Sequence, residues 1–148
     1  MLVLSRSCAD QIRRHGERGY PHEVCGALAG ALTGQAAEVT RCCEAENAWD
    51  AMGLEPETNV TTQRRFAIDP AWILATDREL RNDGLELIGF YHTHPDHPPE
   101  PSETDRKYLC PRVAHVIYSV NGGRGADVAA WYQEEEGGAF RAVALEIR

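Results

Sequence analysis

Two histidines separated by one residue, His92 and His94, are the first residues whose types and spacing suggest chemistry. Residues 85–94 are predicted to form a strand, in which positions i and i+2 project from the same face with Cα atoms roughly 6.6 Å apart. That spacing lets both imidazoles converge on one metal ion, with Zn–N bonds of roughly 2.0 to 2.1 Å. The strand therefore supplies two candidate metal ligands.

Asp105 offers a third ligand. Past the proline-rich loop 95–101, Ser102 is expected to begin a short helix, on which positions i and i+3 share one face. Three protein ligands leave the fourth tetrahedral position of Zn²⁺ for water, whose pKa falls from about 15.7 to about 7 on the metal. An open site of this kind is predicted to be catalytic.

Glu23 is the candidate general base, because water on zinc needs a group that takes its proton and later returns it to the leaving amine. It lies far from the histidines in sequence, at the start of a predicted strand. Its role depends on the sheet bringing that strand beside His92 and His94, which spacing alone does not establish.

Plainer interpretations exist for each of these residues. Ser102 and Asp105 match a helix capping box, although a cap leaves the histidine pair unexplained and both roles can coexist. Glu23 by itself resembles an ordinary surface carboxylate. A helical HExxH zinc motif starting at His22 is excluded because position 26 is glycine. Cys25 is interpreted as a packed core thiol and His97 as a solvated loop histidine.

Together these residues resemble the JAMM (MPN-plus) metalloprotease family, whose motif is E…H-[S/T]-H-x7-S-x2-D. Every position of the motif is present, from Glu23 through His92, His94 and Ser102 to Asp105. The surrounding segments are similar to those of small free-standing prokaryotic members, namely Pro21-His22-Glu23-Val24-Cys25-Gly26 and Arg65-Phe66-Ala67-Ile68-Asp69-Pro70. The resemblance covers about residues 2–132.

The resemblance implies a zinc-dependent hydrolase of peptide or isopeptide bonds, with Ser102 donating a hydrogen bond to the oxyanion. It also implies a cytidine-deaminase-like fold and a protein or peptide substrate whose extended C-terminal tail binds as an added strand, possible substrates including ubiquitin-like sulfur-carrier proteins. The alternative is a non-catalytic MPN-type binding module, which would be expected to lack metal ligands. A zinc nucleoside deaminase is disfavoured because the PCxxC signature is missing around Cys110-Pro111.

The elements that must position these residues form an α+β pattern, predicted to be one domain over residues 1–148 with a single mixed sheet flanked by helices. A long loop is expected over 44–63. The predicted helices are 5–18, 69–82 and 102–109, and the predicted strands are 24–30, 37–43, 85–94, 114–120, 127–133 and 140–147.

Composition narrows the possible partners. The formal net charge is -8, with no long run of Lys and Arg, so no nucleic-acid partner is expected. No stretch approaches the roughly 18 apolar residues of a membrane span, and the start of the chain has no secretory leader, which predicts a cytoplasmic location without membrane contact. The five cysteines form no disulfide-like framework and are expected to be reduced.

Overall fold

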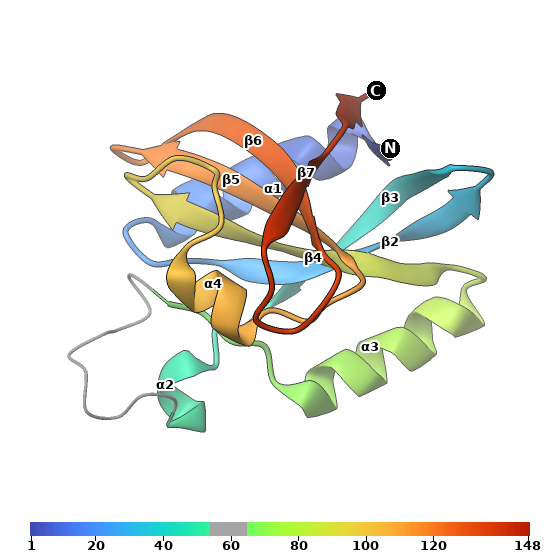
Figure 1. Cartoon of the computed structure of the whole chain (residues 1–148), viewed down its shortest axis with the longest axis horizontal. Helices are drawn as coiled ribbons and strands as arrows, with labels where there is room; N and C mark the ends of the chain where they lie inside the picture. Colours follow the sequence, from blue (N-terminus) through green and yellow to red (C-terminus); the bar gives the residue numbers. More distant parts are fainter. Residues whose placement is uncertain (54–64) are drawn as a thin grey trace.

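One mixed sheet of eight strands organises residues 1–53 and 65–148, the part of the chain that the computed structural model describes (Figure 1). The strands are β1 (Leu2–Leu4), β2 (Cys25–Thr33), β3 (Ala36–Ala45), β4 (Glu86–Pro95), β5 (Ala114–Asn121), β6 (Arg124–Gln133), β7 (Phe140–Val143) and β8 (Leu145–Ile147). Their order across the sheet is β7-β6-β5-β4-β2-β3-β1-β8. Parallel pairs join β1 to β3, β1 to β8 and β4 to β5, whereas the other pairs are antiparallel. The predicted α+β fold with one mixed sheet is confirmed.

The sheet is curled so that its two edges meet. β7 and β8 occupy opposite ends of the strand order, yet only Ala144 separates them in sequence. One residue spans at most about 3.6 Å, so the two edges must lie next to each other. The Ala144 carbonyl accepts a hydrogen bond from the Leu2 N–H at 2.8 Å, which ties this crossing to β1.

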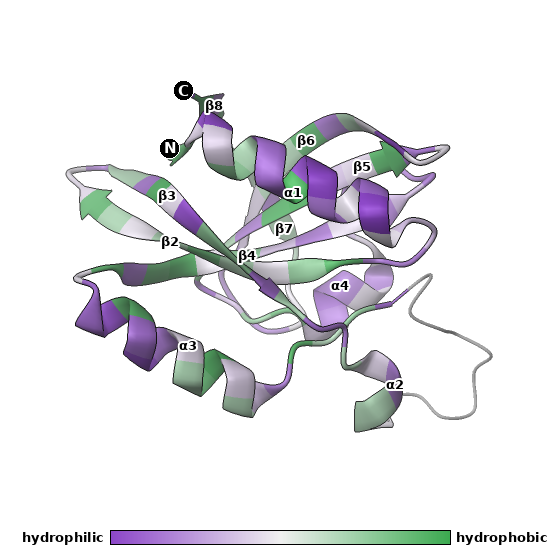
Figure 2. Ribbon diagram, turned by 180° about the vertical axis from the view of Figure 1, so that it is seen from behind, coloured by the Kyte–Doolittle hydropathy of each residue, from purple (hydrophilic) through white to green (hydrophobic). Residues whose placement is uncertain are grey.

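Helix α1 (Arg6–Gly19) packs its apolar side against one face of this curled sheet. Ser5 caps the helix by accepting a hydrogen bond from the Cys8 N–H, as predicted from its position. Hydrophilic residues lie along the outward side of α1 (Figure 2). Its buried side joins residues of nearly every strand in one core, which includes Leu4, Ala9, Ile12, Leu28, Val39, Tyr91 and Val116.

The opposite face of the sheet is covered by α3 (Pro70–Asn82), α4 (Glu103–Tyr108) and the short α2 (Trp49–Met52) (Figures 1 and 2). α3 begins as predicted, with Asp69 accepting the Ala71 N–H and Pro70 in the first turn. The alternation of β4 sends Tyr91 toward α1, where its hydroxyl meets His15 Nδ1 at 2.8 Å. The same alternation sends His92 toward α4.

One strand was missed, and two predictions of elements need correction. β1 was not predicted, since three residues are too few to show a periodic pattern. Residues 140–147 form two strands, because the chain changes from one edge of the sheet to the other at Ala144. Within the predicted loop 44–63, residues 49–52 form α2 around the buried Trp49, whereas 54–63 lie outside the described residues. Among residues 1–53 and 65–148, no helix has the length and apolarity needed to span a bilayer.

Candidate metal-dependent active site

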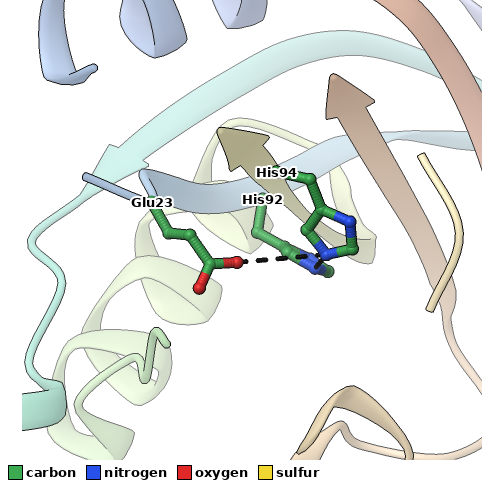
Figure 3. Close-up of side chains that lie close together, drawn as sticks. All are labelled: Glu23, His92 and His94. Atoms are coloured by element: carbon green, nitrogen blue, oxygen red, sulfur yellow. Dashed lines mark hydrogen bonds and ion pairs between the residues drawn. The ribbon is translucent and has the colours of Figure 1, made fainter. Parts of the chain in front are cut away.

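Glu23 is brought to the histidines by the register between β2 and β4. The two strands run antiparallel with Cys25 opposite His92, so continuing the pairing by two residues sets Glu23 opposite His94. The Thr93 N–H donates to the Val24 carbonyl at 3.0 Å, and the Val24 N–H donates to the Thr93 hydroxyl at 2.9 Å. Figure 3 shows the side chains of Glu23, His92 and His94 pointing toward one another.

The two histidines and Asp105 form a tight triangle of potential ligand atoms. The Nε2 atoms of His92 and His94 are 3.1 Å apart, and Asp105 Oδ2 lies 3.2 Å from the first and 3.1 Å from the second. All three side chains are buried. A group of Glu23, His92 and His94, whose ligand atoms all lie within 4.8 Å of one another, could also hold a metal ion.

Asp105 reaches the triangle from the first turn of α4, where it also closes a capping box. Its Oδ2 accepts the Ser102 N–H at 2.9 Å, and its own N–H donates to Ser102 Oγ at 3.1 Å. Ser102 Oγ is an acceptor in this bond, which leaves its hydroxyl proton for another partner. The capping interpretation and the ligand interpretation of this pair are therefore compatible in the structure.

The two carboxyl groups have pKa values shifted in opposite directions. Burial, reinforced by the negative charge of Asp105, raises the pKa of Glu23 well above its usual value, against the opposing effect of Arg65. Although burial alone would raise the pKa of Asp105, the charge and hydrogen bonds of His92 and His94 hold it below the usual range. Paired carboxyl groups in such contrasting surroundings are typical of a site that needs one permanent anion and one proton acceptor.

Each histidine has a second contact that orients its ring. His94 Nδ1 lies 2.9 Å from the Pro98 carbonyl, so a proton on Nδ1 leaves the lone pair of Nε2 facing the triangle. The ring of Phe66 stacks on His92 with centroids 4.3 Å apart and planes 22° apart. Phe66 appeared in the sequence only as part of a family-like segment, and nothing in its spacing indicated contact with a candidate metal ligand.

A family model for prokaryotic homologs of the JAB domain matches residues 5–136. The chain belongs to this family. The predicted relationship to small prokaryotic JAMM/MPN proteins is thereby confirmed.

Two curated relatives support a hydrolytic function for this JAB chain. A protein named desampylase from Haloferax volcanii is 32% identical over 128 residues, which cover 82% of each chain. A protein named probable TtuB-protein conjugate cleaving protease from Thermus thermophilus is 29% identical over 124 residues, covering 84% of this chain and 74% of the relative. Both names describe enzymes that cleave.

Solved structures give the same fold. A solution structure of a Salinibacter ruber protein has a TM-score of 0.69 at 31% identity, and the match covers 98% of this chain and 90% of the Salinibacter chain. A Desulfitobacterium hafniense protein has a TM-score of 0.80 at 20% identity, covering 100% and 93%. A JAB1/MPN domain protein from Archaeoglobus fulgidus has a TM-score of 0.58 at 17% identity, covering 99% and 97%.

Two hollows adjoin the JAB site. A cleft of about 340 Å³ runs past Glu23, His94 and Ser102. A mostly apolar cavity of about 300 Å³ has Asp105 among its lining residues. Arg65 lines both hollows. The apolar cavity is lined chiefly by Phe66, Ile68, Ile73, Phe90, Tyr108 and Leu109.

Other residues considered in the sequence take different positions in this JAB domain. Cys25 is fully buried, and burial followed by the charge of Glu23 raises its pKa to about 12, so the thiol stays protonated. His97 is exposed and lines the cleft, and Trp131 anchors the neighbouring loop by donating from Nε1 to the Pro99 carbonyl at 2.8 Å.

Proposed function

We propose that the chain is a cytoplasmic zinc-dependent peptidase or isopeptidase in which His92, His94 and Asp105 bind Zn²⁺. Glu23 acts as general base, and Ser102 donates a hydrogen bond to the oxyanion. The substrate is a protein with an extended C-terminal tail, of the ubiquitin-like class.

The ligand triangle carries this proposal. Ligand atoms 2.0 to 2.1 Å from a tetrahedral zinc lie roughly 3.3 to 3.4 Å apart. The three separations of 3.1 to 3.2 Å are close to that requirement. Two imidazoles with one carboxylate are a donor set that zinc accepts, and burial lowers the pKa of His92, which favours the neutral ring that binds a metal.

An unpartnered acceptor beside the triangle supports the role of Glu23. Its Oε1 lies 3.9 Å from His94 Nε2, whereas Oε2 is buried and has no hydrogen-bond partner among residues 1–53 and 65–148. Buried polar atoms without partners are rare, and a carboxylate oxygen in this state suits a water molecule that donates to it. A raised pKa also brings a glutamate closer to the neutral range in which a general base works best.

Glu23 and Ser102 have different roles in the proposed reaction. Zinc in this site would supply Lewis-acid activation of water and of the scissile carbonyl. Glu23 takes the proton of the attacking water and delivers it to the leaving amine, so that it ends the cycle in its starting state. Ser102 uses its hydroxyl proton to stabilise the negative charge on the carbonyl oxygen. The burial of all three ligands excludes bulk water from the reacting groups.

The hollows and the relatives support a tail-cleaving role. The cleft accepts an extended main chain beside Glu23 and Ser102, and the apolar cavity accepts a side chain of the tail. One relative is named for cleaving TtuB-protein conjugates, the other for desampylation. From these names and from the family resemblance, we infer that the substrate is a ubiquitin-like sulfur carrier, cut near a Gly-Gly terminus.

A cleavage assay tests the function. The wild-type chain with one equivalent of zinc is incubated with fusions of ubiquitin-like sulfur carriers, with and without a chelator. We expect cleavage that the chelator abolishes and zinc restores. Glu23→Gln should keep zinc and lose turnover, whereas His92→Ala should lose both. A zinc-loaded chain that binds these carriers without cutting them would instead indicate a binding module.

A further inference from the structure

Asn47 uses the full hydrogen-bonding capacity of its side chain to join three segments around the site. Its Nδ2 donates to the Glu23 carbonyl at 3.0 Å and to the Arg65 carbonyl at 2.9 Å. Its Oδ1 accepts the N–H groups of Trp49 and Ala67, both at 3.2 Å. A side-chain amide has two donor hydrogens and two acceptor lone pairs, so all four are occupied here.

Through the first of these bonds, the peptide group between Glu23 and Val24 is hydrogen-bonded at both its carbonyl and its N–H. The carbonyl of that peptide accepts from Asn47, and its N–H, which belongs to Val24, donates to the Thr93 hydroxyl at 2.9 Å. Thr93 stands between the two histidines on β4. The backbone at Glu23 is thereby fixed relative to the histidine strand on one side and to Asn47 on the other.

Two of the remaining bonds fix the segment that contacts His92. Asn47 holds the Arg65 carbonyl and the Ala67 N–H, the two groups that flank Phe66. The ring of Phe66 stacks on His92. The Ala67 carbonyl accepts a hydrogen bond at 2.8 Å from the N–H of Ala48, the residue after Asn47. One side chain thus sets the relative position of Glu23 and of the residue that orients His92.

We propose that Asn47 is a positioning residue that holds the Glu23 carboxylate in register with the histidines. This inference rests on the proposed function of Glu23 as base. Asn47 lies outside the ligand triangle and acts through the peptide groups that it binds. Its loss should misplace the base while the three ligands stay together.

A purely structural role predicts something different. The Trp49 N–H bond is an Asx turn, which alone would stabilise the start of α2. In Asn47→Ser, a shorter hydroxyl can still accept the Trp49 N–H, but it lacks the second donor and the reach for both carbonyls. Asn47→Asp keeps the acceptor oxygen and removes both donors. Both variants can keep the Asx turn at Trp49 but lose the hydrogen bond to the Glu23 carbonyl, so they distinguish the two roles.

The experiment compares Asn47→Ser and Asn47→Asp with the wild type in zinc content, kcat, KM and amide hydrogen exchange. We expect one zinc per chain in both, kcat lower by roughly 10- to 100-fold, and KM changed by less than about twofold, because the misplaced group acts in the chemical step. Independently of activity, exchange at the Ala67 amide should quicken in Asn47→Ser, while exchange in the core of β5 stays unchanged.

Asn82→Ser is the matched control, because Asn82 is exposed at the end of α3 and away from the cleft. It should behave as the wild type. Native kcat in both Asn47 variants, or loss of folding or zinc in both, would overturn the positioning role. If the wild type itself cleaves nothing, the proposed function fails. Accelerated exchange at the Ala67 amide in Asn47→Ser would still test whether Asn47 holds the segment around Phe66.

Discussion

Ser102 and Asp105 hold each other in a reciprocal cap, and the carboxylate oxygen of Asp105 that accepts the Ser102 N–H is the one that faces both histidines. The same oxygen therefore takes part in the capping box of α4 and lies at the candidate metal site. Because the backbone N–H of Ser102 orients Asp105, the Ser102 hydroxyl can be changed without removing that support.

Ser102→Ala is expected to keep zinc but lower kcat by roughly 100- to 1,000-fold through loss of the oxyanion donor. Loss of the bond from the Asp105 N–H to Oγ should also cost about 0.5–2 kcal/mol of unfolding free energy. Enzyme kinetics and urea titration of the same sample measure both. Ser102→Thr keeps the hydroxyl and should retain most of each quantity. An unchanged kcat in Ser102→Ala would exclude Ser102 from the chemistry.

Phe66→Leu is expected to weaken zinc affinity by roughly 10- to 100-fold, because the flat ring stacked on His92 limits the orientations of that imidazole. Competition with a coloured chelator measures the affinity directly. Phe140→Leu is the control, since the Phe140 ring meets His115 edge-on at 6.1 Å. Equal affinities in the two variants would argue that the stack does not orient the ligand.

The buried His115 is expected to make the free energy of unfolding depend on pH. Its ring is buried, with Nε2 2.7 Å from the Cys110 carbonyl, and burial lowers its pKa to about 4. An unfolded histidine has a pKa of about 6.5, so between about pH 6.5 and 4 the unfolded chain binds more protons. Its contribution is complete above pH 6.5 and is lost as the pH falls toward 4, by at most about 3 kcal/mol.

His115→Gln tests this contribution, since the amide can still donate to the Cys110 carbonyl but does not titrate in this range. Urea unfolding of metal-free protein at about pH 7.5 and about pH 4.5 should show a smaller acid loss in the variant than in the wild type. His92 is present in both chains, so its own titration contributes to the acid loss of each. Identical losses would show that His115 is not the titrating group.

The meeting of the three candidate ligands His92, His94 and Asp105 could be predicted from the sequence because local geometry determines most of their placement. Alternation on a strand sets the faces of His92 and His94, and an i to i+3 relation on a helix joins Ser102 to Asp105. The helices 69–82 and 102–109 were also predicted closely, since Asp69-Pro70 and Ser102 are strong helix-start signals.

The position of Glu23, by contrast, depends on strand register. Cys25 opposite His92 is a pairing between residues far apart in sequence, and no local pattern reveals it. The same holds for Phe66 on His92 and for the four bonds of Asn47. The only local hint at Asn47 is its separation of two residues from Trp49, which is typical of an Asx turn before a helix.

The most direct test of the account is zinc content per chain in protein purified without chelator, measured by elemental analysis for the wild type, Asp105→Ala and Glu23→Gln. We expect one zinc in the wild type and in Glu23→Gln, and a large loss in Asp105→Ala, which removes one corner of the ligand triangle. No zinc in the wild type, even after zinc is added, would contradict the proposed mechanism and favour a binding domain.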